Sequence, residues 1–495
     1  MNYAIIRNII GKIMILIAML MILPFSLCII YQEDLNNYLA FLIPICLLVI
    51  IGFLFNIKKA ENKKMLAREG FIIVGISWLI MSLFGCLPFI ISGVLPNFFD
   101  AFFEISSGFT TTGATIMTGS YIEEALVNNH SIMFWRSFSH WIGGMGVLVF
   151  ILAIIPESDE GSSVHILRAE SPGPQVGRLV TKMKASSRIL YLIYIGLTIL
   201  NILFLWFGPD QKMNLYSSFI HAFGTAGTGG FSISSLSLGA YTAYSQYVTA
   251  IFMIVFGINF TMYYLILIGN IKEVLKNEEL RWYLVIVLIS VIFICVSIFE
   301  RYQNFEEAFR VSLFQVASVI STTGYSTVDY AIWPAFSLMI LFILMFIGSC
   351  AGSTAGGIKC SRLVILIKST IKKIKMMINP RKVETIRMDG KPISDETISS
   401  VQSFVLVYLF IFLFCAVIVS IDRRSGNDFV SSITASLACI SNVGPGFSIV
   451  GPSSDFSGFN FFTKFILSLE MICGRLELFP LLILFYPKTW SKKRI

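Results

Sequence analysis

Long apolar runs constrain this chain more than any other feature of its sequence. A transmembrane helix needs about 20 predominantly apolar residues to cross the hydrocarbon core of a bilayer. Charged residues make up 13% of the chain, against roughly 25% in soluble proteins, which excludes a water-soluble enzyme. The sequence therefore predicts an all-α polytopic membrane protein with about ten transmembrane helices, over residues 13–30, 37–57, 71–93, 134–155, 189–207, 247–269, 282–299, 335–358, 401–421 and 461–486.

Basic residues are unevenly distributed between the apolar runs. When the N-terminal segment is placed on the inner side and the runs alternate in direction, 29 of the 37 Lys and Arg residues lie on that side, ten of them in residues 359–400. Because cytoplasmic loops are enriched in Lys and Arg, we expect a multi-pass protein of the cytoplasmic (inner) membrane with both termini in the cytoplasm. The net charge of +8 then reflects topology and gives no reason to expect nucleic-acid binding.

Four short clusters of Gly, Thr and Ser recur between paired apolar runs. A helix-compatible stretch too short to span the membrane precedes each cluster and starts at a candidate capping residue: Asp100, Asn214, Glu307 or a residue near it, and Asp428. Alignment on the key glycines gives four parallel repeats of helix, re-entrant segment and helix. The clusters contain Thr111-Thr112-Gly113, Thr228-Gly229, Thr322-Thr323-Gly324 and Asn442-Val443-Gly444.

The repeats divide the chain into segments. We expect two N-terminal helices followed by four membrane-pore-membrane repeats around one pseudo-fourfold ion pathway. The predicted boundaries are 1–69 for the N-terminal extension, 70–156 for the first repeat, 157–188 for a cytoplasmic linker, 189–271 for the second repeat, 272–361 for the third, 362–399 for a basic cytoplasmic linker and 400–495 for the fourth.

The chemistry of the clusters follows from their backbone. Irregular backbone at membrane depth is tolerated only where it lines water or is buried in protein, because unpaired carbonyl groups are costly in lipid. Four equivalent segments can pool their carbonyl oxygens around one axis and replace the water shell of a dehydrated cation. Glycine permits the backbone angles that this arrangement requires, and the C-terminal ends of short helices favour a positive ion. The clusters therefore predict a cation-selective filter.

Beyond residue 70 the chain resembles the Trk/Ktr/HKT superfamily of potassium transporters. Besides the clusters, the resemblance rests on Trp135-Arg136-Ser137, the run Trp141 to Gly146, the run Gly348 to Lys359, Asp389-Gly390-Lys391-Pro392 and Gly474-Arg475-Leu476-Glu477. The two extra N-terminal spans are similar to the Trk-type membrane subunit of bacteria. The resemblance implies channel-like K⁺ uptake with no organic cofactor, and K⁺ bound at Thr111, Thr112, Thr228, Thr323 and Val443.

The resemblance also implies partners and an ion preference. It implies a homodimer and a cytosolic nucleotide-binding (TrkA-like) regulatory subunit on the basic inner face, although anionic lipid would attract the same charges of residues 359–400. In this family a Ser in place of the first filter glycine accompanies sodium permeation in some plant members, so Gly113 favours potassium. The fourth cluster departs from the Thr-Gly pattern at Val443 and Pro445.

Glycines at positions 348, 352, 356 and 357 interrupt the eighth apolar run. Each glycine weakens a helix by roughly 1 kcal/mol. Two interpretations remain open. The spacing of four from Gly348 to Gly356 matches close helix packing through small residues. The family resemblance implies instead an unwound gating loop that includes Gly348, Gly352, Ser353, Thr354, Gly356, Gly357 and Lys359.

Arg475 lies deep in the last apolar run, where a charge is costly unless it faces a cavity or a partner. One interpretation is a structural ion pair with Glu470 or Glu477. The family resemblance implies a second role, a positive barrier in the pathway that slows cations. Both roles are compatible with each other.

Other functions compete with a channel-like pore. A proton- or sodium-coupled K⁺ symporter of the same fold is the main alternative, because secondary transporters also use broken helices, although their repeats are commonly inverted. A membrane subunit of an ATP-driven K⁺ pump is a third interpretation, but the chain has no ATPase motif. No nucleophile and base stand out as a pair, and the four histidines share no metal-binding spacing, so we expect no enzymatic activity.

Overall fold

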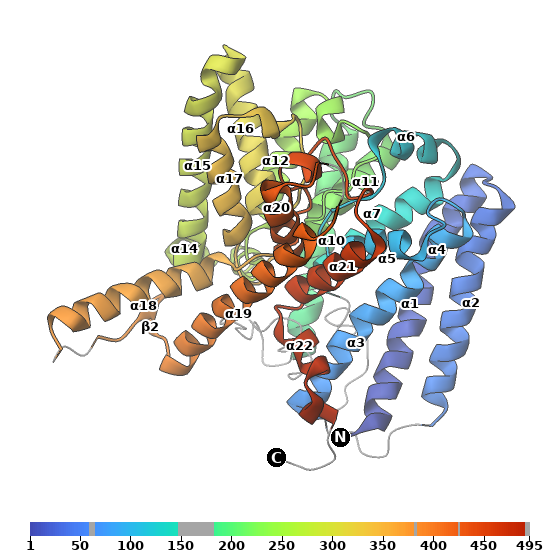
Figure 1. Ribbon diagram of the computed structural model, residues 1–495, viewed down its shortest axis with the longest axis horizontal. Helices are drawn as coiled ribbons and strands as arrows, with labels where there is room; N and C mark the ends of the chain where they lie inside the picture. Colours follow the sequence, from blue (N-terminus) through green and yellow to red (C-terminus); the bar gives the residue numbers. More distant parts are fainter. Residues whose placement is uncertain (59–64, 147–182, 381–383, 424–425, 491–495) are drawn as a thin grey trace.

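The computed structural model describes residues 1–58, 65–146, 183–380, 384–423 and 426–490. Within these residues the chain is mostly helical, and its strands β1 (Arg387–Met388) and β2 (Lys391–Pro392) form a small antiparallel sheet. Figure 1 shows a bundle of long helices in which the first helix starts, and the last one ends, at the same end of the molecule. The predicted all-α polytopic membrane fold is confirmed.

The N-terminal extension is a hairpin of α1 (Tyr3–Tyr31) and α2 (Leu35–Ile57) at one side of the bundle (Figure 1). Gly11 and Gly52 let the two helices approach closely, because a Cβ added to either would lie 2.8 Å from the carbonyl oxygen of the other. At the opposite end of the hairpin, Glu33 accepts a hydrogen bond of 2.8 Å from the Ser131 backbone N–H. This contact ties the hairpin to the start of the first repeat's second helix.

Four repeats follow, each with a first helix, a short pore helix and a second helix. The first has α3 (Ala67–Gly85) with α4 (Leu87–Ile91), α5 (Phe98–Phe109), the connecting α6 (Gly119–Asn128) and α7 (His130–Gly144). The second has α10 (Met183–Trp206), α11 (Leu215–Gly227), and α12 (Ala243–Phe256) with α13 (Phe260–Leu267). The third has α15 (Glu278–Tyr302), α16 (Phe305–Ile320) and α17 (Ala335–Ile347). The fourth has α19 (Asp395–Ser420), α20 (Phe429–Ile440), and α21 (Phe461–Arg475) with α22 (Phe479–Phe485).

The remaining elements lie between these helices or, for η4, after the last of them. They are α14 (Ile271–Lys276), α18 (Cys360–Ile378) and the 3₁₀ turns η1 (Ser237–Ala240), η2 (Tyr330–Ile332), η3 (Ser448–Val450) and η4 (Pro487–Trp490).

The repeats close into a ring. Each pore helix packs on the second helix of the preceding repeat, α11 on α7, α16 on α12 and α20 on α17. The pore helix of the first repeat, α5, packs in turn on α21 of the last repeat. Because this contact joins the two ends of the repeat array, the four pore helices surround a single axis.

The pore helices begin at Asn and Asp side chains that cap their first N–H groups. Two predicted caps are confirmed, since Asn214 and Asp428 accept hydrogen bonds of 2.8 and 2.7 Å from the first turns of α11 and α20. The Asp100 prediction is wrong, because Asn97 caps α5 three residues upstream. In the third repeat the cap was expected at or near Glu307, and it is Asn304, three residues upstream. An Asn side chain at the cap position satisfies the same free N–H groups.

The second helices are short or broken, which the predicted runs do not anticipate in the second and fourth repeats. Six helices among the described residues are long and apolar enough to cross a bilayer, and the pair α12 and α13, bent by 91°, makes a seventh if it counts as one span. In the fourth repeat, Glu477 and Leu478 separate α21 from α22 with positive φ angles of 52° and 71°. The predicted run 134–155 continues beyond α7 into residues that lie outside the described part of the chain.

The two predicted linkers differ from simple loops where they are described. Residues 157–182 of the first lie outside the described residues, and α10 already begins at Met183. Nearly half of the basic linker 362–399 belongs to α18, which projects from the bundle in Figure 1. The hairpin after α18 turns at Asp389 and Gly390, with φ angles of 51° and 76°. Asp389 accepts a hydrogen bond of 2.7 Å from the Glu278 backbone N–H, which docks the hairpin on the start of α15.

Candidate ion pathway

The four pore helices lead into the same backbone turn. A residue with a left-handed φ of 55° to 58° comes first, and a glycine with a φ of 75° to 100° follows two positions later. A left-handed conformation costs a non-glycine residue roughly 1–2 kcal/mol, so its occurrence at four matching places reflects a built geometry. The pairs are Thr111 and Gly113, Thr228 and Gly230, Thr322 and Gly324, and Asn442 and Gly444.

Hydrogen bonds support the same alignment. The residue between the two positive-φ positions donates its backbone N–H to the carbonyl five residues earlier, at 2.8 to 2.9 Å in all four repeats. These four donors are Thr112, Gly229, Thr323 and Val443. We call the four segments 111–113, 228–230, 322–324 and 442–444 the filter segments.

The alignment corrects the sequence-based one by a single residue in the second repeat. Gly230, with a φ of 75°, matches Gly113, Gly324 and Gly444, and Gly229 occupies the middle position instead. Two consecutive glycines concealed this shift, because the sequence does not say which of them has the positive φ. The predicted pair Thr228 and Gly229 still lies within the filter segment.

Contacts around the positive-φ glycines close the four segments into a ring. A Cβ added to any of them would collide with the middle carbonyl oxygen of the next repeat, and the glycine of the fourth repeat faces the first. Since real Cβ atoms essentially never lie within 3.0 Å of another heavy atom, glycine is required at each position. The distances are 1.9 Å from Gly113 to Gly229, 2.0 Å from Gly230 to Thr323, 2.1 Å from Gly324 to Val443 and 2.6 Å from Gly444 to Thr112.

Buried hydroxyl groups hold the filter segments from behind. The Oγ1 atoms of Thr110 and Thr112 lie 2.8 Å apart, and Ser321 Oγ lies 2.6 Å from Thr323 Oγ1. Asn442 Nδ2 donates a hydrogen bond of 2.9 Å to Thr112 Oγ1, which links the fourth segment directly to the first. Side chains at these positions therefore serve the scaffold, and the carbonyl oxygens remain for the ring.

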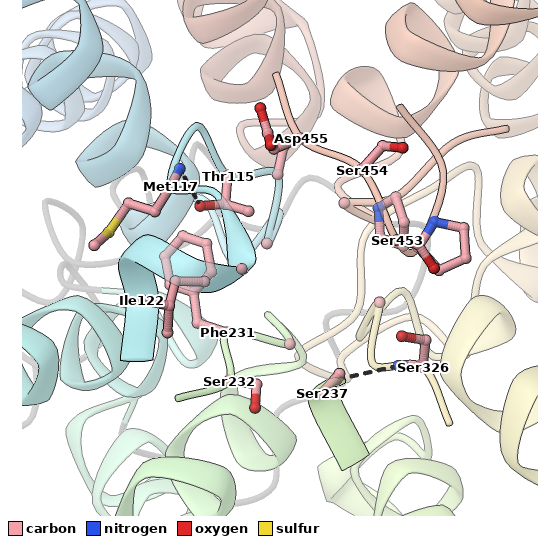
Figure 2. A pocket seen from close by; sticks show the side chains of 18 of the residues that line it. Thr115, Met117, Ile122, Phe231, Ser232, Ser237, Ser326, Ser453, Ser454 and Asp455 are labelled. Atoms are coloured by element: carbon pink, nitrogen blue, oxygen red, sulfur yellow. Dashed lines mark hydrogen bonds between the residues drawn. The ribbon is translucent and has the colours of Figure 1, made fainter. Parts of the chain in front are cut away.

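A cavity of about 110 Å³ lies against the ring. The positive-φ glycines of all four filter segments contribute to its lining. Figure 2 shows Thr115, Phe231, Ser326 and Asp455 around this cavity, on loops from different repeats. The cavity gives the ring access from the side of the pore-helix connections.

A buried ion pair supports the first two filter segments. Arg136 Nε lies 2.7 Å from Glu104 Oε1, and both side chains are almost completely buried. The guanidinium also donates to the Ser232 carbonyl at 3.1 Å and to Thr115 Oγ1 at 3.0 Å, and its carbon lies 3.6 Å from the centroid of the Phe231 ring. Sequence reasoning missed this pairing, although two opposite charges in apolar surroundings are the signal that could have found it.

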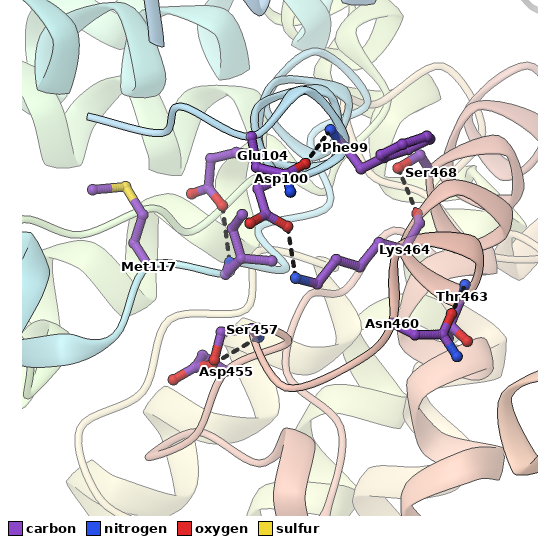
Figure 3. Close-up of polar contacts among 12 residues, drawn as sticks. Phe99, Asp100, Glu104, Met117, Asp455, Ser457, Asn460, Thr463, Lys464 and Ser468 are labelled. Atoms are coloured by element: carbon purple, nitrogen blue, oxygen red, sulfur yellow. Dashed lines mark hydrogen bonds and ion pairs between the residues drawn. The ribbon is translucent and has the colours of Figure 1, made fainter. Parts of the chain in front are cut away.

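A second ion pair joins the first and fourth repeats. Lys464 Nζ of α21 lies 2.6 Å from Asp100 Oδ1 of α5. Figure 3 shows this pair near Glu104, in the region where α5 and α21 meet. The contact explains why Asp100 does not cap its helix, because its carboxylate faces the neighbouring repeat.

Residues 348–359 form a folded loop between α17 and α18, not a continuous helix. Positive φ angles of 66°, 72°, 73° and 81° occur at Gly348, Gly352, Gly357 and Lys359. The Lys359 ammonium is almost completely buried and donates a hydrogen bond to the Ala355 carbonyl within the loop. The alternative interpretation of this run as a helix-packing seam therefore fails.

The loop contacts the third filter segment directly. The Gly356 backbone N–H donates to Thr322 Oγ1 at 2.7 Å, and Ser349 Oγ donates to the last carbonyl of α16 at 2.9 Å. The buried Glu279 carboxylate accepts hydrogen bonds of 2.7 and 3.0 Å from the backbone N–H groups of Ala351 and Ser361. One carboxylate thus fastens both ends of the loop to α15.

The Arg475 guanidinium bridges the loop and the first repeat. It donates hydrogen bonds of 2.6 Å to the Thr354 carbonyl, 2.6 Å to the Gly143 carbonyl and 2.5 Å to the Gly144 carbonyl. These carbonyls belong to backbone that lies beyond the filter segments along the chain of each repeat. Arg475 therefore connects the second helices of the first and fourth repeats to the loop of the third.

The carboxylates considered as partners of Arg475 make other contacts. Glu477 forms an ion pair with Arg362. Glu470 accepts a hydrogen bond of 2.6 Å from Ser436 on pore helix α20.

The fold and the site together define the class of protein. Helices long enough to span a bilayer and four equivalent segments in one closed ring describe an integral membrane protein built from four repeats of a single chain around one axis. Comparison with known proteins gives the family. Residues 38–493 match the TrkH family, described as cation transport protein, and the chain belongs to this family. The family expected from the sequence is confirmed.

Individual relatives extend over the whole chain. The Trk system potassium uptake protein TrkH of Salmonella typhimurium is 33% identical over 99% of this chain and 100% of that protein. The Escherichia coli K12 protein of the same name is 32% identical over the same shares. The crystal structure of the potassium transporter TrkH from Vibrio parahaemolyticus is similar with a TM-score of 0.85 and 29% identity, covering 99% of this chain and 100% of that one.

Proposed function

We propose that this protein takes up K⁺ across the cytoplasmic membrane through a channel-like pore. The closed ring of filter segments is the observation that carries the proposal, because four backbone carbonyls from four repeats meet around one axis. Such carbonyl rings replace the hydration shell of a dehydrated cation. K⁺ is the transported substrate, and transport needs no organic cofactor.

The ion ligands follow from the corrected alignment. Thr112, Gly229, Thr323 and Val443 supply the carbonyls of one level, and Thr111 and Thr228 belong to the level before it. The relatives named for potassium uptake support K⁺ as the ion. Glycine at all four positive-φ positions of the ring further supports K⁺ as the ion, because a side chain at any of these positions would displace a carbonyl.

We place the gate in the loop 348–359 and in Arg475. The loop contacts Thr322 of the filter through Gly356, and Arg475 contacts the loop through Thr354. Glycines with positive φ keep alternative backbone conformations within reach, so a partner that prefers one conformation can shift the population of open pores. The guanidinium adds a positive barrier that slows cations.

The partners and the orientation complete the proposal. We assign the end of the bundle that carries α18 and both chain ends to the cytoplasm, because basic residues concentrate there. A homodimer with a cytosolic nucleotide-binding regulatory subunit on this face fits the Trk system for which the relatives are named. The regulator would act through α18, which continues directly from the loop.

Ion flux into proteoliposomes that contain only this chain tests the proposal. We expect K⁺ entry down its gradient, K⁺ preferred over Na⁺, and no requirement for a proton or sodium gradient. Uptake that stops when those gradients are removed would establish the symporter instead. Absence of K⁺ flux from monodisperse, reconstituted protein would refute the channel-like pore.

A further inference from the structure

The second filter segment lacks side chains where the other segments have them. Behind the ring, the middle residue and the residue two positions earlier are Thr112 and Thr110 in the first repeat, Thr323 and Ser321 in the third, and Val443 and Ser441 in the fourth. In the second repeat both positions are glycine, 227 and 229. Side chains at these positions support the filter from behind in the first, third and fourth repeats, so the second repeat needs another support.

His140 of α7 fills the space that these two glycines leave. A Cβ on Gly229 would lie 2.3 Å from Cγ and 2.3 Å from Nδ1 of the His140 imidazole. A Cβ on Gly227 would lie 2.2 Å from the His140 carbonyl oxygen. The side chain of one residue from the first repeat thus occupies the place of a missing side chain in the second.

Aromatic stacking fixes the imidazole in this place. The His140 and Phe231 ring centroids are 4.2 Å apart with an interplanar angle of 27°. The Arg136 guanidinium makes a cation–π contact with the same Phe231 ring. The His140 side chain is completely buried, and neither ring nitrogen has a protein hydrogen-bond partner within the described part of the chain. The imidazole therefore acts at this position through its size and shape, and not through hydrogen bonds.

We propose that His140 is a positioning residue for ion selectivity, which sets the place of the Gly229 carbonyl by standing in for the side chain that Gly229 lacks. The inference rests on the proposed function of the ring as a K⁺ filter. It assigns a role to a residue that lies behind the filter and does not contact the ion. It also explains why this repeat alone carries glycine at the middle position.

A size exchange between the two residues tests the inference. Gly229→Thr recreates the middle residue of the first and third repeats, and His140→Ala removes the ring with which that side chain would collide. We expect each single variant to lower the K⁺/Na⁺ flux ratio at least fivefold. We expect the double variant His140→Ala/Gly229→Thr to return the ratio to within twofold of wild type.

Gly227 provides the matched control. Its added Cβ would meet the carbonyl of His140, which no side-chain substitution removes. We therefore expect Gly227→Ala to impair the protein equally with and without His140→Ala. If a single variant fails to fold, the yield of monodisperse protein becomes the measurement, and the double variant at 229 should recover it whereas the double variant at 227 should not.

Three results would overturn the role of His140. They are a wild-type flux ratio in His140→Ala, a double variant at 229 no better than its parents, or equal rescue of Gly227→Ala. The wild-type protein tests the proposed function separately. If it fails to prefer K⁺ over Na⁺, the filter proposal fails, whereas a selective wild type without rescue refutes only the assignment to His140.

Discussion

Gly113→Ala is the substitution for which the structure gives the clearest quantitative expectation. The added Cβ would lie 1.9 Å from the Gly229 carbonyl oxygen, and real Cβ atoms are not found within 3.0 Å of such neighbours. The carbonyl must therefore move by at least 1.1 Å relative to Gly113. Because Gly113 has a φ of 80°, alanine also strains the backbone.

Two free-energy terms follow from this geometry. The left-handed backbone costs alanine roughly 1–2 kcal/mol of folding stability. A displaced carbonyl also loses its interaction with the bound cation, and hydrogen bonds to charged groups, the nearest measured analogue, contribute about 1.5–3 kcal/mol. Since 1.4 kcal/mol corresponds to a factor of ten, we expect the apparent K⁺ affinity to weaken roughly 10- to 100-fold.

Gly93→Ala separates the two terms. Gly93 has nearly the same φ, 81°, but no heavy atom lies within 4 Å of its added Cβ. Both variants should lose the stability that the left-handed backbone costs alanine. Gly113→Ala should lose further stability through the collision with the Gly229 carbonyl, and only Gly113→Ala should lose K⁺ affinity. The assay is K⁺-dependent flux in proteoliposomes, normalised to monodisperse protein and measured over a range of K⁺ concentrations. Apparent K⁺ affinities that agree within twofold between the two variants would refute the role of the ring.

Four further outcomes are expected. Arg475→Ala should raise K⁺ flux per folded molecule, whereas loss of folded protein with no such gain would leave Arg475 only a structural role. Replacement of residues 352–354 by Ala-Leu-Ala should change K⁺ flux and its response to a regulator, while the K⁺/Na⁺ flux ratio stays constant. Wild-type flux and wild-type regulation in this variant would exclude the loop as a gate. Glu104→Ala leaves the buried Arg136 unpaired and should lower the free energy of unfolding by about 3–5 kcal/mol, measured by thermal or denaturant unfolding. Hydrogen bonds from Ser431 lower the pKa of Asp428. The capping interaction, which contributes about 0.5–2 kcal/mol of stability, is therefore fully present above the ordinary carboxyl pKa and is lost as the pH falls through the lowered pKa. The stability difference between wild type and Asp428→Ala should shrink over the same pH range.

Local sequence patterns were sufficient for the fold and for the position of the positive-φ glycine in three of the four clusters. Apolar runs of membrane-spanning length predict the long helices, and the clusters around Gly113, Gly324 and Gly444 mark three of the four corners of the ring correctly. These features depend on neighbouring residues and on backbone conformation. The one-residue error in the second repeat arose because Gly229 and Gly230 are equivalent as letters and differ only in φ.

Contacts between helices that are distant in sequence could not be predicted in the same way. The pairing of Arg136 with Glu104 depends on how α5 and α7 pack, and Arg475 donates hydrogen bonds to carbonyls of two other repeats. The capping error at Asp100 has the same origin, because its carboxylate pairs with Lys464 from the far end of the chain. A sequence identifies such groups as unusual, but only the packed repeats decide their partners.

The four filter segments of the ring are not all identical, since the middle residues are Thr112 and Thr323 in the first and third repeats, Gly229 in the second and Val443 in the fourth. In a channel assembled from four identical subunits, one substitution in the filter changes every corner at once. In this chain a change in one codon alters one filter segment and leaves the other three unchanged. Under the proposed function, selectivity can therefore change in small steps during evolution, and each filter segment can acquire its own supporting residues without disabling the other three.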